Sequence, residues 1–289
     1  MSNNNCSISR VFSKKVLIEL LEKGTNNVYD YVIRRYIDNP DTKTNGEILS
    51  EIYAKLSKSY RNEYFYTNTL LNKLLVGIHN VNTTTALAQV RIADHIADFV
   101  MINGEGNVYE IKSELDNLER LNAQILDYYK AFSKVSVLAS ERESKNVEKV
   151  LKKLGSTGEY VGIFVLTERD TIFSRLNSKE PIIWEDHLEH KSLFNLLRKN
   201  EYESIIKTKF GSIPTVQPVF LYKACLSKFS ELPIQEAQQL VLSKLKNRNR
   251  ITTEEFKRIP KELRSIIYFS GLNKRTPEIA RFLGQPYHA

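Results

Sequence analysis

Two acidic residues and a lysine stand close together near the middle of the chain. Asp98 is followed twelve residues later by Glu110, and Lys112 comes two residues after that. Alternate residues of a β-strand project to the same face, about 6.6 Å apart, so Glu110 and Lys112 should project together. The intervening Asn103–Asn107 segment is rich in Gly and Asn and predicts a hairpin turn at Gly104 to Gly106. Antiparallel pairing would then bring Asp98 opposite residue 111 or 112.

Two carboxylates and an ammonium on one face suit a hard divalent cation. Burying such charges without partners is costly, whereas Mg²⁺ binds carboxylate and backbone carbonyl oxygens and keeps several waters. The cation would lower the pKa of a bound water and stabilise charge on a phosphate. Lys112 could orient or deprotonate that water, or stabilise the developing negative charge. The alternative is a cross-strand salt bridge without catalysis. Asp94 repeats the Ile-Ala-Asp triplet of Asp98, but it would pair near Asp116, so Asp98 is preferred.

Two polar residues lie on otherwise apolar helical stripes. Gln124 stands between Leu121 and Tyr128 at helical spacing, and Glu63 stands one turn before Tyr66. Each could be an ordinary residue at the edge of its stripe. Together they could complete a polar pocket above the hairpin.

The elements that would position these residues follow from hydrophobic periodicity and turn signals. Helices are expected over about 16–21, 28–37, 48–56 and 61–76, and again from Asp116, where Asp116 and Glu119 could form a capping box. Strands are expected over 86–92, 96–102, 108–112, 135–139 and 160–166, with a helix over 144–154. From Glu185 onward the pattern is helical. The alternation predicts an α/β fold in which helices pack against a sheet.

These motifs, taken as a spaced string, resemble the PD-(D/E)xK nuclease superfamily. The string consists of Ile96-Ala97-Asp98-Phe99-Val100, Tyr109-Glu110-Ile111-Lys112, Gln124 and Tyr128. Residues 63–132 resemble more closely a bacterial and phage domain family of uncharacterised function within that superfamily. The resemblance implies a restriction-endonuclease-like core of a helix, a three-stranded meander, a helix and a strand. Helical N- and C-terminal additions would flank that core.

The resemblance also implies roles for individual residues. Asp98 and Glu110 would bind Mg²⁺ or Mn²⁺, the Ile111 carbonyl would be a further ligand, and Lys112 would be the catalytic lysine. Glu63 and Gln124 would extend and shape the site. The implied reaction is phosphodiester hydrolysis, most often of DNA. A role in a phage or mobile element would suit the resemblance.

The charge of the chain is unevenly distributed. The net charge is +8, and residues 191–289 contain 18 Lys and Arg against 8 Asp and Glu. A basic region can be a footprint for nucleic acid, and Lys244, Lys246, Arg248 and Arg250 form a run that could contact phosphates. A solvated loop is the alternative. These patterns predict a helical N-terminal region over 1–59, a nuclease-like core over 60–185 and a basic helical region over 186–289.

Several protein classes are disfavoured by composition. The two cysteines, Cys6 and Cys225, lie far apart in the sequence, so a disulfide framework is not expected and a reducing cytoplasm fits best. No apolar run approaches the ~18 residues of a membrane span. The oligomeric state is open, a homodimer included. Two rival functions stay open as well: a nuclease-like fold that binds nucleic acid or protein without cutting, and a helical regulatory or interaction protein.

Overall fold

The computed structural model describes residues 2–79, 81–172, 178–248 and 251–287. The chain divides into two compact units, one of Met1–Asn82 with Ile251–Ala289 and the other of Thr83–Arg250. This division differs from the expected boundaries after residues 59 and 185. Both ends of the chain contribute to the first unit, and the basic C-terminal third is shared between the two.

The first unit is helical and joins segments from the two ends of the chain. Its elements are α1 (Ser2–Val11), α2 (Lys14–Lys23), α3 (Asn27–Tyr36), η1 (Pro40–Thr42), α4 (Asn45–Ser59), α5 (Glu63–Asn72), η2 (Lys73–Ile78), α13 (Thr253–Arg258), α14 (Arg264–Ser270), η3 (Leu272–Arg275) and α15 (Thr276–Gly284). The buried Asn68 amide donates to the Lys261 carbonyl at 2.9 Å and accepts from Ser265 N at 3.0 Å. Because a buried amide needs such partners, Asn68 fixes the C-terminal segment against α5.

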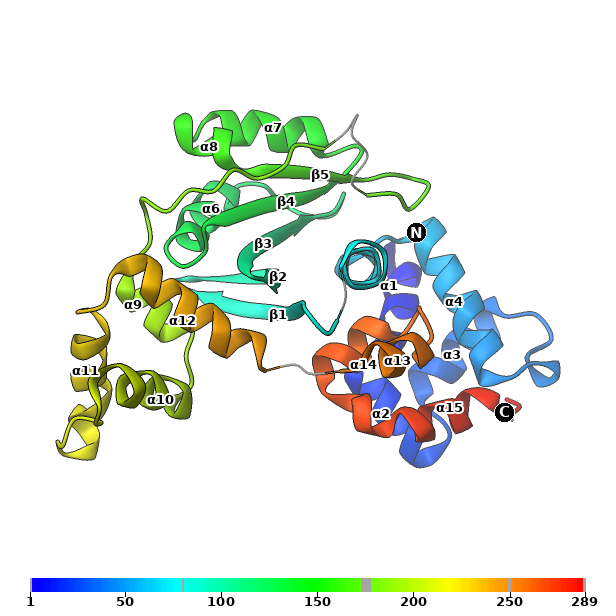
Figure 1. The fold of residues 1–289 in the computed structure, drawn as a ribbon. Helices are drawn as coiled ribbons and strands as arrows, with labels where there is room; N and C mark the ends of the chain where they lie inside the picture. Colours follow the sequence, from blue (N-terminus) through cyan, green and yellow to red (C-terminus); the bar gives the residue numbers. More distant parts are fainter. Residues whose placement is uncertain (1, 80, 173–177, 249–250, 288–289) are drawn as a thin grey trace. The chain divides into compact units, whose positions relative to one another are not determined.

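The second unit contains a mixed five-stranded sheet in the order β1-β2-β3-β4-β5 (Figure 1). The strands are β1 (Thr85–Ile92), β2 (His95–Asn103), β3 (Glu105–Lys112), β4 (Lys134–Ser140) and β5 (Gly162–Leu166). The first three form an antiparallel meander, and β3, β4 and β5 run parallel. The expected mixed α/β architecture is therefore confirmed.

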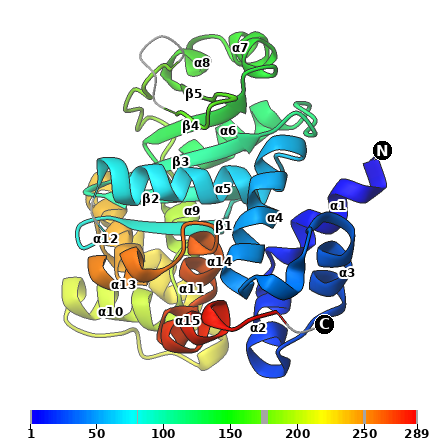
Figure 2. The ribbon, with the colours of Figure 1, turned by 90° about the vertical axis from the view of Figure 1, so that its right-hand side faces the viewer.

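Helices pack against this sheet and around its ends. They are α6 (Leu121–Tyr129), α7 (Ser144–Lys152), α8 (Ser156–Tyr160), α9 (His190–Asn195), α10 (Lys199–Phe210), α11 (Pro218–Phe229) and α12 (Ile234–Lys246). One apolar core joins α6, α7 and α9 to α12 with the strands, while α7 and α8 lie beside β5 (Figures 1 and 2). Throughout the described part of the chain, no helix combines the length and apolarity of a membrane span.

The hairpin between β2 and β3 is tighter than the sequence predicted. Asn103 pairs with Glu105, and Gly104 alone forms the turn with φ 76°. Glycine adopts this positive φ without steric cost. Because the turn is short, Phe99 pairs with Tyr109, which places Asp98 level with Glu110 rather than with residue 111 or 112.

The segment after β3 also departs from expectation. Asp116 does not cap a helix; its carboxylate accepts the backbone N–H of Ser113 at 2.8 Å. The helix α6 begins at Leu121, with Arg120 at the N-cap and no side-chain capping bond. The carboxylate expected to cap α6 is thus used in the turn that follows Lys112.

Candidate active site

Glu110 and Lys112 lie near the carboxyl end of β3, the central strand of the sheet. The strand pairs with β2 on one side and with β4 on the other, where Glu110 is level with Val137 and Lys112 with Ala139. This central position explains why the Glu110 and Lys112 side chains are only 2% and 8% exposed. A charged pair in such a position requires compensating partners.

The Glu110 carboxylate accepts hydrogen bonds from three side chains. Its Oε1 accepts from Lys112 Nζ at 2.8 Å and from Gln124 Nε2 at 2.5 Å. Its Oε2 accepts from the Tyr128 hydroxyl at 2.6 Å. Lys112 Nζ also donates to Gln124 Oε1 at 3.0 Å. The Gln124 amide therefore bonds both charged groups and fixes their relative position.

The Tyr128 hydroxyl supports this network from α6. Burial raises the pKa of Tyr128, and the negative charge of Glu110 raises it further. The hydroxyl therefore stays protonated and can donate. It also lies 3.0 Å from the Ile96 carbonyl oxygen, so it connects the network to β2.

Asp98 approaches the same strand from β2. The β2–β3 pairing ends at Phe99 and Tyr109, and beyond that point Asp98 Oδ2 accepts the backbone N–H of Ile111 at 2.8 Å. The Asp98 carboxylate thus accepts the N–H that a backbone carbonyl of β2 would accept if the strand pairing continued. Its negative charge also contributes to the raised pKa of Tyr128. The second unit consequently brings together Asp98, Glu110, Lys112 and Gln124.

Glu63 belongs to the other unit. It is the first residue of α5 and is exposed, and its participation in the site stays a prediction. Within the described ranges, no group of three or more His, Cys, Asp or Glu side chains is arranged to hold a metal ion. The predicted ligand set, the Asp98 and Glu110 carboxylates with the backbone oxygen of Ile111, stays a prediction.

Two residues of the predicted phosphate-binding run, Lys244 and Arg248, bond other side chains of the protein. Arg248 Nε donates to Glu201 Oε1 at 2.8 Å, and its guanidinium also bonds Glu201 Oε2 and the Leu196 carbonyl. With both side chains at most 16% exposed, Arg248 is a structural ion-pair partner rather than a phosphate contact. Lys244 donates to Ser204 Oγ at 2.8 Å. Arg250 lies outside the described residues, and Lys246 stays a prediction.

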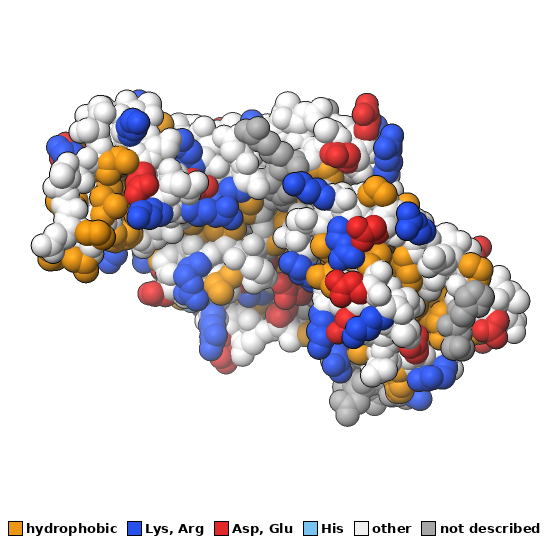
Figure 3. All heavy atoms as spheres, turned by 90° about the horizontal axis from the view of Figure 1, so that it is seen from below, with side chains coloured by type: hydrophobic (Ala, Val, Ile, Leu, Met, Phe, Trp, Pro, Cys, Tyr) orange, Lys and Arg blue, Asp and Glu red, His pale blue; other side chains and the backbone are white. Residues whose placement is uncertain are grey.

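The basic charge counted over residues 191–289 does not produce a uniformly basic surface on α10 and α11. Apolar side chains gather over the α10 and α11 end of this region, at the left of Figure 3. On α11, Val219 is 76% exposed and Phe220 is 57% exposed. Several lysines nearby are paired with acids, among them Lys209 with Glu236 at 2.6 Å. Sequence-level charge therefore overstates the basic surface here.

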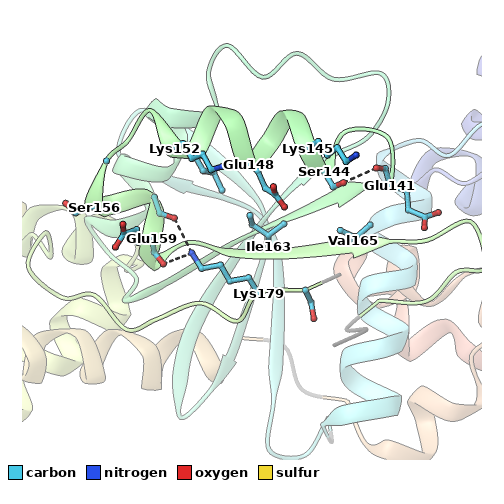
Figure 4. A pocket seen from close by; sticks show the side chains of 14 residues that line it. Glu141, Ser144, Lys145, Glu148, Lys152, Ser156, Glu159, Ile163, Val165 and Lys179 are labelled. Carbon is cyan, nitrogen blue, oxygen red and sulfur yellow. Dashed lines mark hydrogen bonds between the residues drawn. The ribbon is translucent and has the colours of Figure 1, made fainter. Parts of the chain in front are cut away.

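A cavity of about 880 Å³ lies between α7, α8 and β5. Figure 4 shows Lys145, Glu148 and Lys152 lining it from α7 and Lys179 approaching from the segment after β5. Lys179 Nζ donates to the Glu159 carbonyl at 2.6 Å. The described lining contains lysines and glutamates in equal number, three of each, so it has no net charge to favour phosphate. None of the predicted site residues lines it.

Two features near the network were not identified as site residues from the sequence. Tyr128 follows Gln124 by one helical turn, so the spacing could have indicated that both face Glu110. Regular alternation along β2 would place the His95 and Asp98 side chains on opposite faces of the sheet, and His95 Nδ1 lies 2.6 Å from Asp127 Oδ2 on α6. The β1–β2 pairing skips Gln89 and Asp98, and Gln89 has φ 53°. The strand pairing is therefore irregular at Asp98.

Comparison with known proteins identifies a phage-related family. The chain belongs to the bacteriophage P4 protein cII family, whose model matches residues 57–267. Protein cII of Enterobacteria phage P4 is 25% identical over 166 residues, which cover 55% of this chain and 57% of that protein. The chain thus spans little more than half the length of this curated relative. No solved structure matches the chain.

Proposed function

We propose that this member of the bacteriophage P4 protein cII family is a metal-dependent nuclease that hydrolyses phosphodiester bonds, with DNA as its substrate. The proposal includes a PD-(D/E)xK site on a restriction-endonuclease-like core, and action in a reducing cytoplasm. The observation that carries it is the convergence of Glu110, Lys112 and Gln124 beside Asp98. These are the residue types that the superfamily places in its site.

Burial makes a purely structural role for the charged pair a weaker explanation. A buried ion pair often contributes no more stability than well-packed apolar residues of the same volume. Here the pair lies on the central strand and has two further polar partners, Gln124 and Tyr128. The arrangement is therefore costly to build, and a chemical role accounts for its composition.

The donor set fits a hard divalent cation. Asp98 and Glu110 supply carboxylate oxygens, which Mg²⁺ and Mn²⁺ prefer. The N–H and C=O of a strand residue point toward the same neighbouring strand. Because the Ile111 N–H donates to Asp98 on β2, the Ile111 carbonyl also points toward β2. With few protein ligands, we expect weak binding of the cation, with water completing its coordination.

Each side chain of the network then has a distinct task. A bound cation would lower the pKa of a coordinated water and neutralise charge on the phosphate. The Lys112 ammonium would orient the attacking water and stabilise the negative charge that develops on the phosphate. Gln124 positions that ammonium, and Tyr128 holds the Glu110 carboxylate in place.

One observation favours a second function, a nuclease-like module that binds nucleic acid without cutting it. All three donors to Glu110 are protein side chains, and its carboxylate is almost completely buried. The role of a carboxylate with these hydrogen bonds could be purely structural: it would hold α6, through Gln124 and Tyr128, against the sheet. In that case metal would neither bind nor promote cleavage.

The experiment is a metal titration and a cleavage assay on the full chain. Single- and double-stranded DNA and RNA would be incubated with Mg²⁺ or Mn²⁺, and metal binding would be followed by calorimetry. The proposal expects Glu110→Ala to lose both binding and cleavage. Lys112→Ala should keep metal binding, because a positive charge near the cation is removed, while losing cleavage. The binding module would be favoured by two results together: the wild type cleaves no substrate, and metal titrations of Glu110→Ala and Lys112→Ala match that of the wild type.

A further inference from the structure

His95 and Asp127 form a hydrogen-bonded dyad where β2 begins. His95 Nδ1 lies 2.6 Å from Asp127 Oδ2, and the two side chains are 25% and 10% exposed. The described residues provide no partner for the other ring nitrogen, Nε2. The dyad therefore consists of a largely buried carboxylate and a partly exposed imidazole.

The carboxylate of this dyad is firmly anchored. Asp127 Oδ1 accepts from Lys130 Nζ at 2.7 Å, and Oδ2 also accepts the backbone N–H of Asp94 at 3.2 Å. Burial alone would raise the pKa of Asp127, but the hydrogen bonds from Lys130 and His95 outweigh it and hold that pKa below its ordinary value. Asp127 is therefore ionised at neutral pH.

An ionised carboxylate can only accept a hydrogen bond. The proton between the two side chains must therefore belong to His95 Nδ1. The neutral imidazole is consequently fixed as the tautomer with a lone pair on Nε2, and the imidazolium carries its second proton there. A carboxylate that fixes the tautomer and stabilises the imidazolium is the arrangement that proton-transfer histidines require.

The dyad lies next to the candidate active site. Asp127 and Tyr128 are consecutive on α6, and the Tyr128 hydroxyl contacts both Glu110 Oε2 and the carbonyl of Ile96, the residue after His95. One hydroxyl therefore bridges the Ile96 carbonyl oxygen and the Glu110 carboxylate, so these two groups lie close together. Asp98 lies three residues after His95 on β2.

We propose that His95 is the general acid that protonates the leaving oxygen of the cleaved phosphodiester. The proposal rests on the nuclease function above and adds the residue that completes the reaction. As the water oxygen bonds to phosphorus, the bond from phosphorus to the bridging oxygen breaks, and its electron pair remains on that oxygen. The proton on His95 Nε2 passes to this oxygen, while the attacking water releases a proton to solvent.

The charged surroundings suit this role. Asp94 and Lys130 both contact Asp127 of the dyad, and Glu189 acts electrostatically on Lys130. After donating its proton, His95 becomes the neutral tautomer that Asp127 already holds. It then regains a proton from solvent. Lys112 would meanwhile stabilise the phosphate, so the two residues would act on different oxygens.

The test compares His95→Gln with wild type on two matched oligonucleotides in Mn²⁺. One is natural, and the other carries sulfur in place of the leaving oxygen at the mapped cleavage position. A thiolate leaves without protonation, so the variant should lose about 100-fold on natural DNA and little on the sulfur substrate. His187→Gln, at an exposed histidine of the same unit, is the control, and thermal unfolding verifies that each variant folds.

The outcomes separate the two proposals. Equal losses on both substrates would make His95 a structural residue, and no loss on natural DNA would exclude it from proton transfer; either result leaves the nuclease function standing. A wild type that cleaves neither substrate would overturn the nuclease function and the general acid with it. Asp127→Asn should reproduce the same selective loss, because it removes the group that fixes the tautomer.

Discussion

Lys112 Nζ lies 2.8 Å from Glu110 Oε1, and both side chains are almost completely buried. Removing one member of such a pair leaves an uncompensated charge, which costs about 3 to 5 kcal/mol. We therefore expect Lys112→Met to lower the free energy of unfolding by roughly that amount. Glu110→Gln combined with Lys112→Met should lose less than the two single changes added together. Urea unfolding of all three variants measures this coupling, and strictly additive losses would contradict the described network.

Tyr128 and Tyr129 offer a matched comparison. Both are fully buried, but the Tyr128 hydroxyl donates to Glu110, whereas the Tyr129 hydroxyl has no hydrogen-bond partner among the described residues. Tyr128→Phe should lower stability by about 1.5 to 3 kcal/mol, because a bond to a charged group is lost. Tyr129→Phe should be neutral or stabilising. Equal losses in thermal or urea unfolding would show that Glu110 does not depend on Tyr128.

Gln124 should affect catalysis more than metal binding. Its amide bonds both Glu110 and Lys112, so Gln124→Leu leaves both charged groups in place but less well oriented. We expect cleavage to slow by about 10- to 100-fold, with Mg²⁺ affinity nearly unchanged. Gln239→Leu, at an exposed position on α12, is the control. A variant that cleaves at the wild-type rate would remove Gln124 from the site.

The Arg248–Glu201 pair predicts a specific dependence on pH. Burial would raise the pKa of Glu201, but hydrogen bonds from Arg248 and the Arg198 backbone outweigh it and lower the pKa below its ordinary value of 4.5. The pair therefore contributes its full stability above that value and loses it as pH falls through the lowered folded-state pKa. Arg248→Gln should be less stable at neutral pH, and its further loss in acid should be smaller than that of the wild type.

Urea unfolding at a series of pH values from 7 to 3 measures this difference. Arg169→Gln, at an exposed position of the same unit, should follow the wild-type curve. If Arg248→Gln also follows that curve, the guanidinium is not a structural partner. It would then be available for phosphate contact, as its place in the basic run first suggested.

Local patterns predicted the strands and the meeting of the central charges well. Runs of apolar and β-branched residues identified β1 to β5 approximately, and the i, i+2 spacing of Glu110 and Lys112 placed both on one face. Gln124 could be recognised because a polar residue on an apolar helical stripe must face the sheet. These features depend on periodicity alone, which a sequence displays directly.

What could not be predicted depends on contacts between distant segments. The first unit forms because α5 and the C-terminal segment share buried partners such as Asn68, and nothing local signals that pairing. The pairing register shifted because only Gly104 forms the hairpin turn. The contact of His95 with Asp127 was not predicted because it joins β2 to α6. The ion pair of Arg248 was not predicted because its partner Glu201 lies on another helix.

The central claim is that Lys112 acts in the chemistry and not only in folding. The most direct test is the single-turnover rate of DNA cleavage in saturating Mg²⁺ by wild type and Lys112→Ala, with Lys149→Ala on the exposed face of α7 as the matched control. The rate should fall by about a thousandfold for Lys112→Ala and stay unchanged for the control. A folded, metal-binding Lys112→Ala variant that cleaves at the wild-type rate would contradict the proposed mechanism.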